Sequence, residues 1–196
     1  MADMPPSVVI LAGPNGAGKT TAAPFVLRDA LGVDEFVNAD DIARGLSGFA
    51  PERSAVAAGR IMLARMRELA GVRATFAFET TLATRSYAPW LSRMRQTGYR
   101  ATLVFLSLPS ADAAVERVRG RVAEGGHDVP EPVVRRRYAR GLRNLWNLYL
   151  PLADDWSVYD NAGRTPDLMA VGSGMIVERV VLQSQWKRLR GGCGDE

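Results

Sequence analysis

The chain has 196 residues, of which 47% are hydrophobic and 23% charged, with a net charge of +4, values that are ordinary for one soluble globular domain. No apolar run reaches the roughly 18 residues that a membrane span needs, and no basic and then apolar leader indicates a signal peptide, so we expect no membrane partner. The single cysteine, Cys193, excludes an internal disulfide bond and fits a cytoplasmic protein.

The first expected elements are a buried strand over Val8–Leu11, a glycine-rich turn and a helix over Thr20–Leu31. The turn reads G-x-x-x-x-G-K-T, the spelling of a phosphate-binding loop, or P-loop, in which backbone N–H groups and a helix N-terminus converge on one anion. The nucleotide-binding residues that we predict are Gly13, Pro14, Asn15, Gly16, Ala17, Gly18, Lys19, Thr20 and Thr21.

Two side chains of this loop carry its chemistry. Lys19 would reach the β- and γ-phosphates of the nucleotide, and the hydroxyl of Thr20 would ligate Mg²⁺. The motif therefore predicts that ATP or GTP binds together with Mg²⁺, but it does not say where the phosphate goes.

A short second strand is expected over Glu35–Asn38, and two aspartates follow it. Because the carboxyl ends of parallel strands line the ligand crevice, Asp40 would face the loop and could accept the proton of a substrate hydroxyl. The alternative is that Asp40 or Asp41 caps the helix that begins here.

A helix over Ser54–Leu69 and a third strand over Ala74–Phe78 come next. Glu79 directly follows this buried strand, where a charge is costly unless it has a partner. Substrate hydroxyls or the Mg²⁺ shell would supply that partner, and an ion pair with an arginine is the structural alternative. Arg85 lies further along the same loop and is a candidate for contact with the substrate.

Four elements follow: a helix over Pro89–Gln96, a buried strand over Ala101–Leu108, and helices over Ala111–Glu124 and Pro132–Leu150. The last two helices, with the loop Gly125–Pro130, form an arginine-rich unit over about residues 117–140. We predict that this unit is a small lid, which closes over the phosphates, excludes water and stabilises transition-state charge.

Eight arginines lie between Arg117 and Arg143. Arg117 and Arg121 are spaced i, i+4 and share a helix face, whereas periodicity does not separate Arg136 from Arg137, although Arg137 lies beside the apolar stripe. His127, the only histidine, is either a lid contact or a turn residue. Basic residues can also bind nucleic acid, but arginines near a phosphate loop have a simpler task, so we expect no nucleic-acid partner.

The remaining elements are a strand over Trp156–Tyr159, a strand over Met175–Val181 and a basic helix over Leu182–Arg190. Asn161, after the first of these strands, either contacts the nucleotide base or forms a plain turn. The alternation of strands and helices predicts an α/β fold with a parallel sheet covered on both faces. We expect one domain over residues 1–190 and a flexible tail over 191–196.

These segments resemble the zeta-toxin family of P-loop kinases. The resemblance lies in G-P-N-G-A-G-K-T-T, F-V-N-A-D-D-I-A, F-A-F-E-T-T-L and R-V-R-G-R-V-A-E-G-G-H-D-V-P, within about residues 8–161. It implies the P-loop NTPase fold, with a parallel five-stranded sheet of order 2-3-1-4-5 and a small helical lid. It also implies transfer of the γ-phosphate of ATP or GTP to a small-molecule hydroxyl. In the characterised toxins the acceptor is UDP-N-acetylglucosamine, and a small antitoxin blocks the nucleotide site.

The resemblance also assigns roles to residues. Lys19 and Thr20 hold phosphates and metal, and Asp40 is the base. Glu79 and Thr81 hold the substrate, and Arg117 or Arg121 assists transfer. The substrate-binding residues that we predict from the residues and the resemblance together are Asp40, Glu79, Thr81, Arg85, His127 and Arg137.

The chain departs from the family at two points, since it has E-T-T-L where the toxins have E-G-T, and their second lid arginine has no clear match. The kinase interpretation is therefore better supported than the toxin interpretation, and whether the protein is a toxin stays open, as does an antitoxin-like protein partner. The alternatives are a nucleotide-dependent switch or ATPase in an interaction complex, and a nucleic-acid-modifying kinase.

Overall fold

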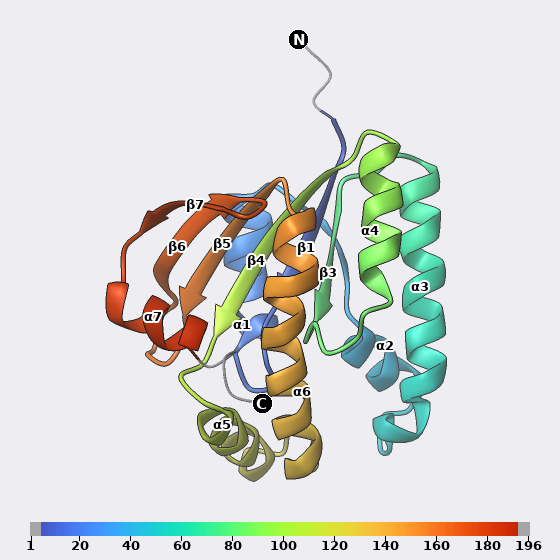
Figure 1. Ribbon diagram of the computed structural model, residues 1–196. Helices are drawn as coiled ribbons and strands as arrows, with labels where there is room; N and C mark the ends of the chain where they lie inside the picture. The colour runs from blue at the N-terminus through green and yellow to red at the C-terminus, as the bar shows by residue number, and fades with distance from the viewer. Residues whose placement is uncertain (1–4, 192–196) are drawn as a thin grey trace.

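The computed structural model describes residues 5–191, apart from the side chain of Glu52. Its strands form one sheet in the order β2-β3-β1-β4-β5-β6-β7 (Figure 1). Pairing is parallel from β2 to β5 and antiparallel for β6 and β7. The strands are β1 (Ser7–Ala12), β2 (Glu35–Val37), β3 (Phe76–Thr80), β4 (Arg100–Ser107), β5 (Asp155–Asp160), β6 (Asp167–Ser173) and β7 (Ile176–Val180).

The predicted order 2-3-1-4-5 is confirmed for the first five strands, but the prediction of a five-stranded parallel sheet is wrong. The sheet continues into an antiparallel hairpin, whose second strand, β7, lies within the expected strand Met175–Val181. The first strand of the hairpin, β6, was not expected, because its short apolar run stands among glycines and prolines that normally mark loops. Gly172 shows why a glycine lies within β6, since a Cβ there would come within 2.4 Å of the Trp156 ring.

Helices cover both faces of the sheet, as predicted. One hydrophobic core packs against α3, α4, α6 and α7, and a second core, on the other face of the sheet, packs against α1 and α5. The helical segments are α1 (Lys19–Ala23), η1 (Pro24–Ala30), α2 (Ala39–Leu46), η2 (Pro51–Ser54), α3 (Ala55–Gly71), α4 (Tyr87–Gln96), α5 (Ala111–Ala123), α6 (Glu131–Asn144), η3 (Leu145–Tyr149), η4 (Leu150–Leu152) and α7 (Gln183–Gly191).

The central strand β1 shows how the two cores form. Val8 and Ile10 enter the core on one face of the sheet, and Val9 and Leu11 enter the core on the other. A strand that is buried on both faces reads as a continuous apolar run, and this is the run that precedes the glycine-rich loop. Burial of β1 therefore fixes the place where the loop leaves the sheet.

Several boundaries differ from the expected ones. The helix expected over Thr20–Leu31 changes from α to π geometry at Pro24, because Pro24 has no N–H to donate to the carbonyl of Thr20. Strand β3 extends to Thr80, and its Glu79 pairs in register with Leu11 of β1. The carboxylate of Glu79 is therefore held by a strand rather than by a loop.

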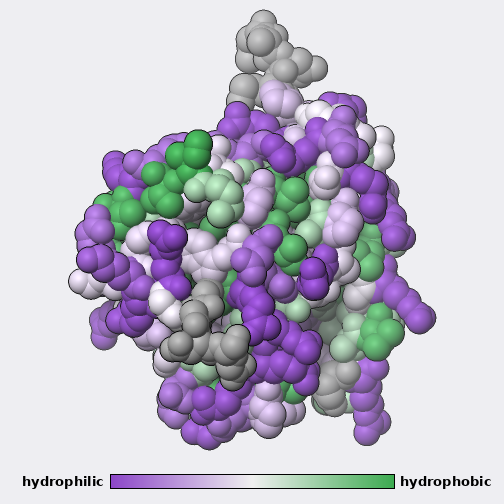
Figure 2. Space-filling model, viewed as in Figure 1, coloured by the Kyte–Doolittle hydropathy of each residue, from purple (hydrophilic) through white to green (hydrophobic). Residues whose placement is uncertain are grey.

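Exposed hydrophobic side chains gather on one region of the surface. Figure 2 shows hydrophobic side chains gathered over the β6–β7 hairpin, where Met175 and Ile176 are each 69% exposed. No helix within residues 5–191 is long and apolar enough to cross a membrane. Of the predicted flexible tail, Gly191 is the last residue of α7, and residues 192–196, including Cys193, lie outside the described residues.

Candidate active site

The phosphate-binding loop lies at the carboxyl end of the sheet, between β1 and α1. Its backbone is tied to the neighbouring strand, since the N–H of Gly13 donates to the carbonyl of Thr80 at 3.3 Å. Gly18 precedes α1 in the left-handed region, with φ of 73°, so that α1 begins at Lys19. The loop and the first turn of this helix therefore have the arrangement that the motif predicts for binding phosphate.

Glu79 lies at the centre of a polar network beside this loop. Its carboxylate accepts hydrogen bonds from the Thr20 hydroxyl and from Asn38 Nδ2, both at 3.0 Å. Its other oxygen lies 3.5 Å from Lys19 Nζ, and the two side chains are 11% and 6% exposed. The expected structural alternative, a pair with an arginine, is not found, because the cationic partner of Glu79 is Lys19.

The charge of Lys19 depends on these neighbours. Burial lowers the pKa of Lys19 below its ordinary value, and the carboxylates of Glu79 and Asp40 oppose that shift. Nζ also donates to the carbonyl of Pro14 at 3.0 Å. A buried ammonium is costly without such partners, so the structure holds a cation at the point where the motif predicts phosphates.

Asp40 lies in the first turn of α2, and the N-cap of this helix is Asn38, two residues earlier. The Oδ1 atom of Asn38 accepts a hydrogen bond from the backbone N–H of Asp40 at 2.8 Å. The alternative that Asp40 or Asp41 caps this helix is therefore wrong. Asp41 forms an ion pair with Arg44, whereas the Asp40 carboxylate is close enough to Lys19 to act on its pKa.

One cavity of about 1000 Å³ joins these groups. It brings together most of the predicted site. The predicted residues that are not among its lining residues are Gly13, Pro14, Ala17, Arg85, His127 and Asn161. The predicted residues that line it are Asn15, Gly16, Gly18, Lys19, Thr20, Thr21, Asp40, Glu79, Thr81, Arg117, Arg121 and Arg137.

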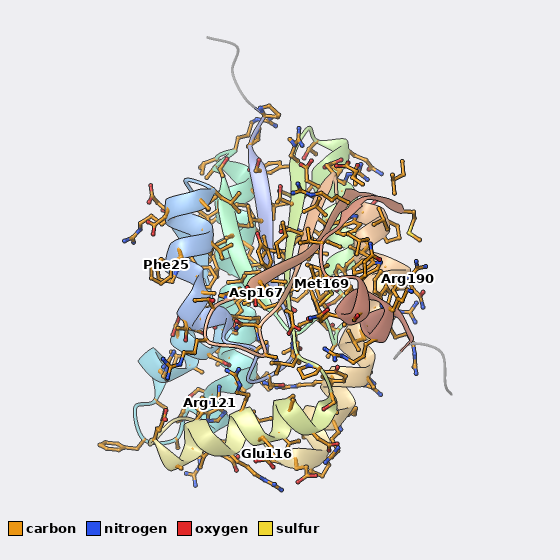
Figure 3. The ribbon with its side chains drawn as sticks, turned by 90° about the vertical axis from the view of Figure 1, so that its left-hand side faces the viewer. Phe25, Glu116, Arg121, Asp167, Met169 and Arg190 are labelled. Carbon is orange, nitrogen blue, oxygen red and sulfur yellow. The ribbon has the colours of Figure 1, made fainter. Side chains whose placement is uncertain are left out.

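Helix α5 lies across the end of the sheet and carries Arg121 toward the loop (Figure 3). A Cβ on Gly16 would lie 2.7 Å from the Cβ of Arg117, so a glycine is needed for this close approach. Arg117 donates to the carbonyls of residues 161 to 163. The helix therefore packs directly on the phosphate loop, and Arg117 and Arg121 line the cavity next to that loop.

Only some of the hydrogen-bond donors of Arg121 have an acceptor within the described protein. Its Nη2 donates to the backbone carbonyl of His127 at 2.6 Å, whereas its buried Nε has no hydrogen-bond partner among the described residues. A buried donor of this kind needs an acceptor, and a phosphate oxygen is a suitable one. His127 therefore contacts Arg121 through its backbone carbonyl, and it does not line the cavity.

The side chain of Asn161 forms a hydrogen bond within the protein. It is buried, and its Nδ2 donates to the carbonyl of Ala17 at 2.7 Å. It connects the end of β5 to the phosphate loop across 144 residues of sequence. Arg85 is exposed in the loop that follows β3.

Sequence reasoning missed several lining residues. Asn38 has a detectable signal, since asparagine before a helix is a preferred cap, and Arg140 follows Arg136 by four residues on the same helix face. Met62 and Tyr87 had no signal that distinguishes them from core residues. The cavity residues that were not predicted are Asn38, Ala39, Met62, Thr80, Ala83, Thr84, Tyr87, Ala113, Glu116, Gly120, Glu124, Arg136 and Arg140.

The strand order, the loop after β1 and the helix that begins at Lys19 define a protein of the P-loop α/β class. Residues 8–144 match the model of the AAA domain family, so the chain belongs to this family. An uncharacterized protein of Haemophilus influenzae is 25% identical over 130 residues, which are 66% of this chain and 91% of that protein.

Solved structures show the same fold at low sequence identity. AvrRxo1-ORF1:-ORF2 with ATP has a TM-score of 0.74 and 16% identity; the match covers 94% of this chain but spans only 63% of that one. The PezAT toxin-antitoxin system of Streptococcus pneumoniae gives 0.64 and 14%, covering 100% of this chain and 90% of that one. A gluconokinase from Sinorhizobium meliloti gives 0.52 and 16%, with coverage of 97% and 92%. The likeness to zeta-toxin-type and small-molecule kinase folds agrees with the resemblance in the motifs.

Proposed function

We propose that the protein is a P-loop kinase that transfers the γ-phosphate of ATP or GTP to a hydroxyl of a small molecule. The observation that supports this most is the composition of one cavity, which is lined by the phosphate loop, Asp40 and five arginines. At about 1000 Å³ it is at the upper end of the range for ligand pockets, roughly 300–1,000 Å³. A second substrate therefore has room beside the nucleotide.

The donor half is formed by the loop and α5. Lys19 would leave Glu79 for the β- and γ-phosphates, and Arg117 and Arg121 would neutralise charge that develops on the transferring group. The hydroxyl of Thr20 and the carboxylate of Glu79, which are hydrogen-bonded at 3.0 Å, offer the oxygen donors that Mg²⁺ prefers. Bound there, Mg²⁺ would neutralise phosphate charge. This position gives Glu79 a role on the donor side, in addition to the substrate contact predicted from the resemblance.

The acceptor half is centred on Asp40. Its carboxylate lines the cavity and is close enough to Lys19 to affect the pKa of that lysine. A carboxylate beside the phosphates can orient an acceptor hydroxyl and take its proton as the phosphate is transferred. Thr81 lines the same cavity and is placed to contact the acceptor.

The test is an Asp40→Asn variant, with Asp41→Asn as the matched control. Asp41 is the adjacent aspartate, is exposed, pairs with Arg44 and does not line the cavity. Loss of a general base typically lowers kcat by about 10²–10⁴-fold. We expect this loss for Asp40→Asn, with unchanged ATP affinity, when transfer of labelled γ-phosphate to a metabolite extract is measured.

Two results would contradict the proposal. Normal transfer by Asp40→Asn would show that Asp40 is not the base. Slow ATP hydrolysis that no metabolite fraction accelerates would favour the nucleotide-dependent switch instead. A protein partner that covers the nucleotide cavity, as an antitoxin would, is a further proposal, supported by the likeness to the fold of a toxin-antitoxin system.

A further inference from the structure

Three arginines on one side of α6 have no use in the donor half of the site. Arg136, Arg137 and Arg140 line the cavity, yet within residues 5–191 no hydrogen bond or ion pair joins them to another residue. Their neighbour Arg135, by contrast, pairs with Asp112 and Glu131. Arg135, which does not line the cavity, is therefore neutralised, whereas the three arginines that line it have no partner among residues 5–191.

Helix α6 and the segment that continues it, η3, contact the loop that follows β3. These contacts set the position of the three arginines. Asn144 Nδ2 donates to the carbonyl of Leu82 at 2.7 Å, and the hydroxyl of Tyr149 donates to the carbonyl of Thr84 at 2.6 Å. A Cβ on Gly141 would lie 2.5 Å from the carbonyl oxygen of Thr81. The helix therefore packs on the loop without space between them.

Gly141 is one residue after Arg140 and four after Arg137. Arg137 therefore lies on the face of α6 that packs on Thr81, and Arg136 and Arg140 line the same cavity. Arg117 and Arg121, by contrast, lie on α5, which packs on the phosphate loop. Two arginine groups on two helices thus flank the cavity, one at the donor phosphates and one at the loop where the proposed acceptor binds. Met62 and Tyr87 line the same cavity and add apolar and aromatic surface.

We propose that Arg137 and Arg140, assisted by Arg136, bind an anionic group of the acceptor, so that the phosphorylated molecule carries a phosphate or carboxylate as well as the reacting hydroxyl. The inference rests on the proposed kinase function and names the class of its substrate. Arginine suits this task because its planar fork binds either oxyanion through two parallel hydrogen bonds. An anion held by a rigid helix also fixes the orientation of the hydroxyl relative to Asp40.

The first experiment measures binding of inorganic phosphate to protein that is saturated with Mg²⁺ and a non-hydrolysable ATP analogue. With the donor half filled, the phosphate reports on the remaining anion site. We expect the double variant Arg137→Gln/Arg140→Gln to weaken phosphate binding by about tenfold or more, since each charge-assisted hydrogen bond contributes about that factor. The affinity for the ATP analogue should stay within twofold.

Arg143→Gln is the matched control, because Arg143 is exposed on the same helix and does not line the cavity. It should leave both affinities unchanged. Equal phosphate binding by the double variant and the control would overturn the inference. Loss of affinity for the ATP analogue in the double variant would also overturn it, since the arginines would then serve the donor.

The second experiment separates a metabolite extract by anion exchange at neutral pH and supplies each fraction with γ-labelled ATP. We expect the label in the retained fraction and slower labelling by the double variant. Prior treatment of that fraction with a phosphatase, which is then removed, abolishes labelling if the acceptor carries a phosphate and spares it if the anion is a carboxylate.

The outcomes distinguish the two proposals. Labelling of the unretained fraction would leave the kinase function intact and refute an anionic acceptor. Labelling of no fraction would refute the kinase function, and the phosphate-binding measurement would still decide what the α6 arginines do.

Discussion

Replacement of Asn161 by alanine tests whether this residue anchors the phosphate loop. Its Nδ2 donates to the carbonyl of Ala17 at 2.7 Å, and Ala17 is fully buried. The substitution leaves that carbonyl without its partner, and an unsatisfied buried acceptor costs about 1–3 kcal/mol. We therefore expect the free energy of unfolding to fall by that amount. The affinity for ATP should also fall, because Ala17 belongs to the loop that holds the phosphates.

The assay is urea unfolding followed by circular dichroism, together with titration of ATP and of GTP. Asn147→Ala is the matched control, since Asn147 is exposed and should change stability by less than about 0.5 kcal/mol. An anchoring role predicts equal losses of affinity for ATP and GTP, because the loop contacts only phosphates. If the variant keeps the wild-type stability but its ratio of ATP affinity to GTP affinity changes, Asn161 does not anchor the loop. Its predicted contact with the nucleotide base would then be favoured.

Two further predictions concern the contacts that place α6. Gly141→Ala should destabilise the protein by about 1–3 kcal/mol through overpacking, since the new Cβ would lie 2.5 Å from the carbonyl oxygen of Thr81. Gly59→Ala is the control, because Gly59 lies in a helix and a Cβ there would have nothing within 4 Å, so this variant should be more stable than the wild type. Equal effects of the two substitutions in urea unfolding would contradict the packing argument. Burial raises the pKa of Tyr149, whose hydroxyl donates to Thr84. Because the folded state keeps the phenol protonated while the unfolded phenol ionises at about pH 10, stability should fall as pH rises above that value. The fall should be shallower for Tyr149→Phe when urea midpoints are compared between pH 9 and 11, and identical slopes would count against this cause.

Much of the donor half could be predicted from the sequence because its chemistry is contiguous. The motif from Gly13 to Thr20 needs a buried strand before it and a helix after it, and both are visible as local patterns. That Asp40 and Glu79 line one cavity with this loop could also be predicted, since residues at the carboxyl ends of parallel strands meet at one edge of a sheet. Five of the strands and their order followed from the alternation of elements and from the family resemblance.

Other features required the tertiary structure. The ion pair of Glu79 with Lys19 joins β3 to the start of α1, and the hydrogen bond of Asn161 joins the end of β5 to the phosphate loop. Neither contact leaves a pattern within a short window of sequence. Strand β6 was missed because its pairing with β5 and β7 outweighs the loop signals around it.

The arginines show the division most clearly. Their number and their place on two helices are legible in the sequence, and so is the shared face of Arg117 and Arg121. The place of each group along the cavity depends on Gly16 and Gly141, where the absence of a side chain lets α5 approach the phosphate loop and α6 approach Thr81. The sequence determines the residue types and the local elements, because propensity and periodicity act over a few residues. The tertiary structure decides which groups meet, because close packing joins residues that the sequence keeps far apart.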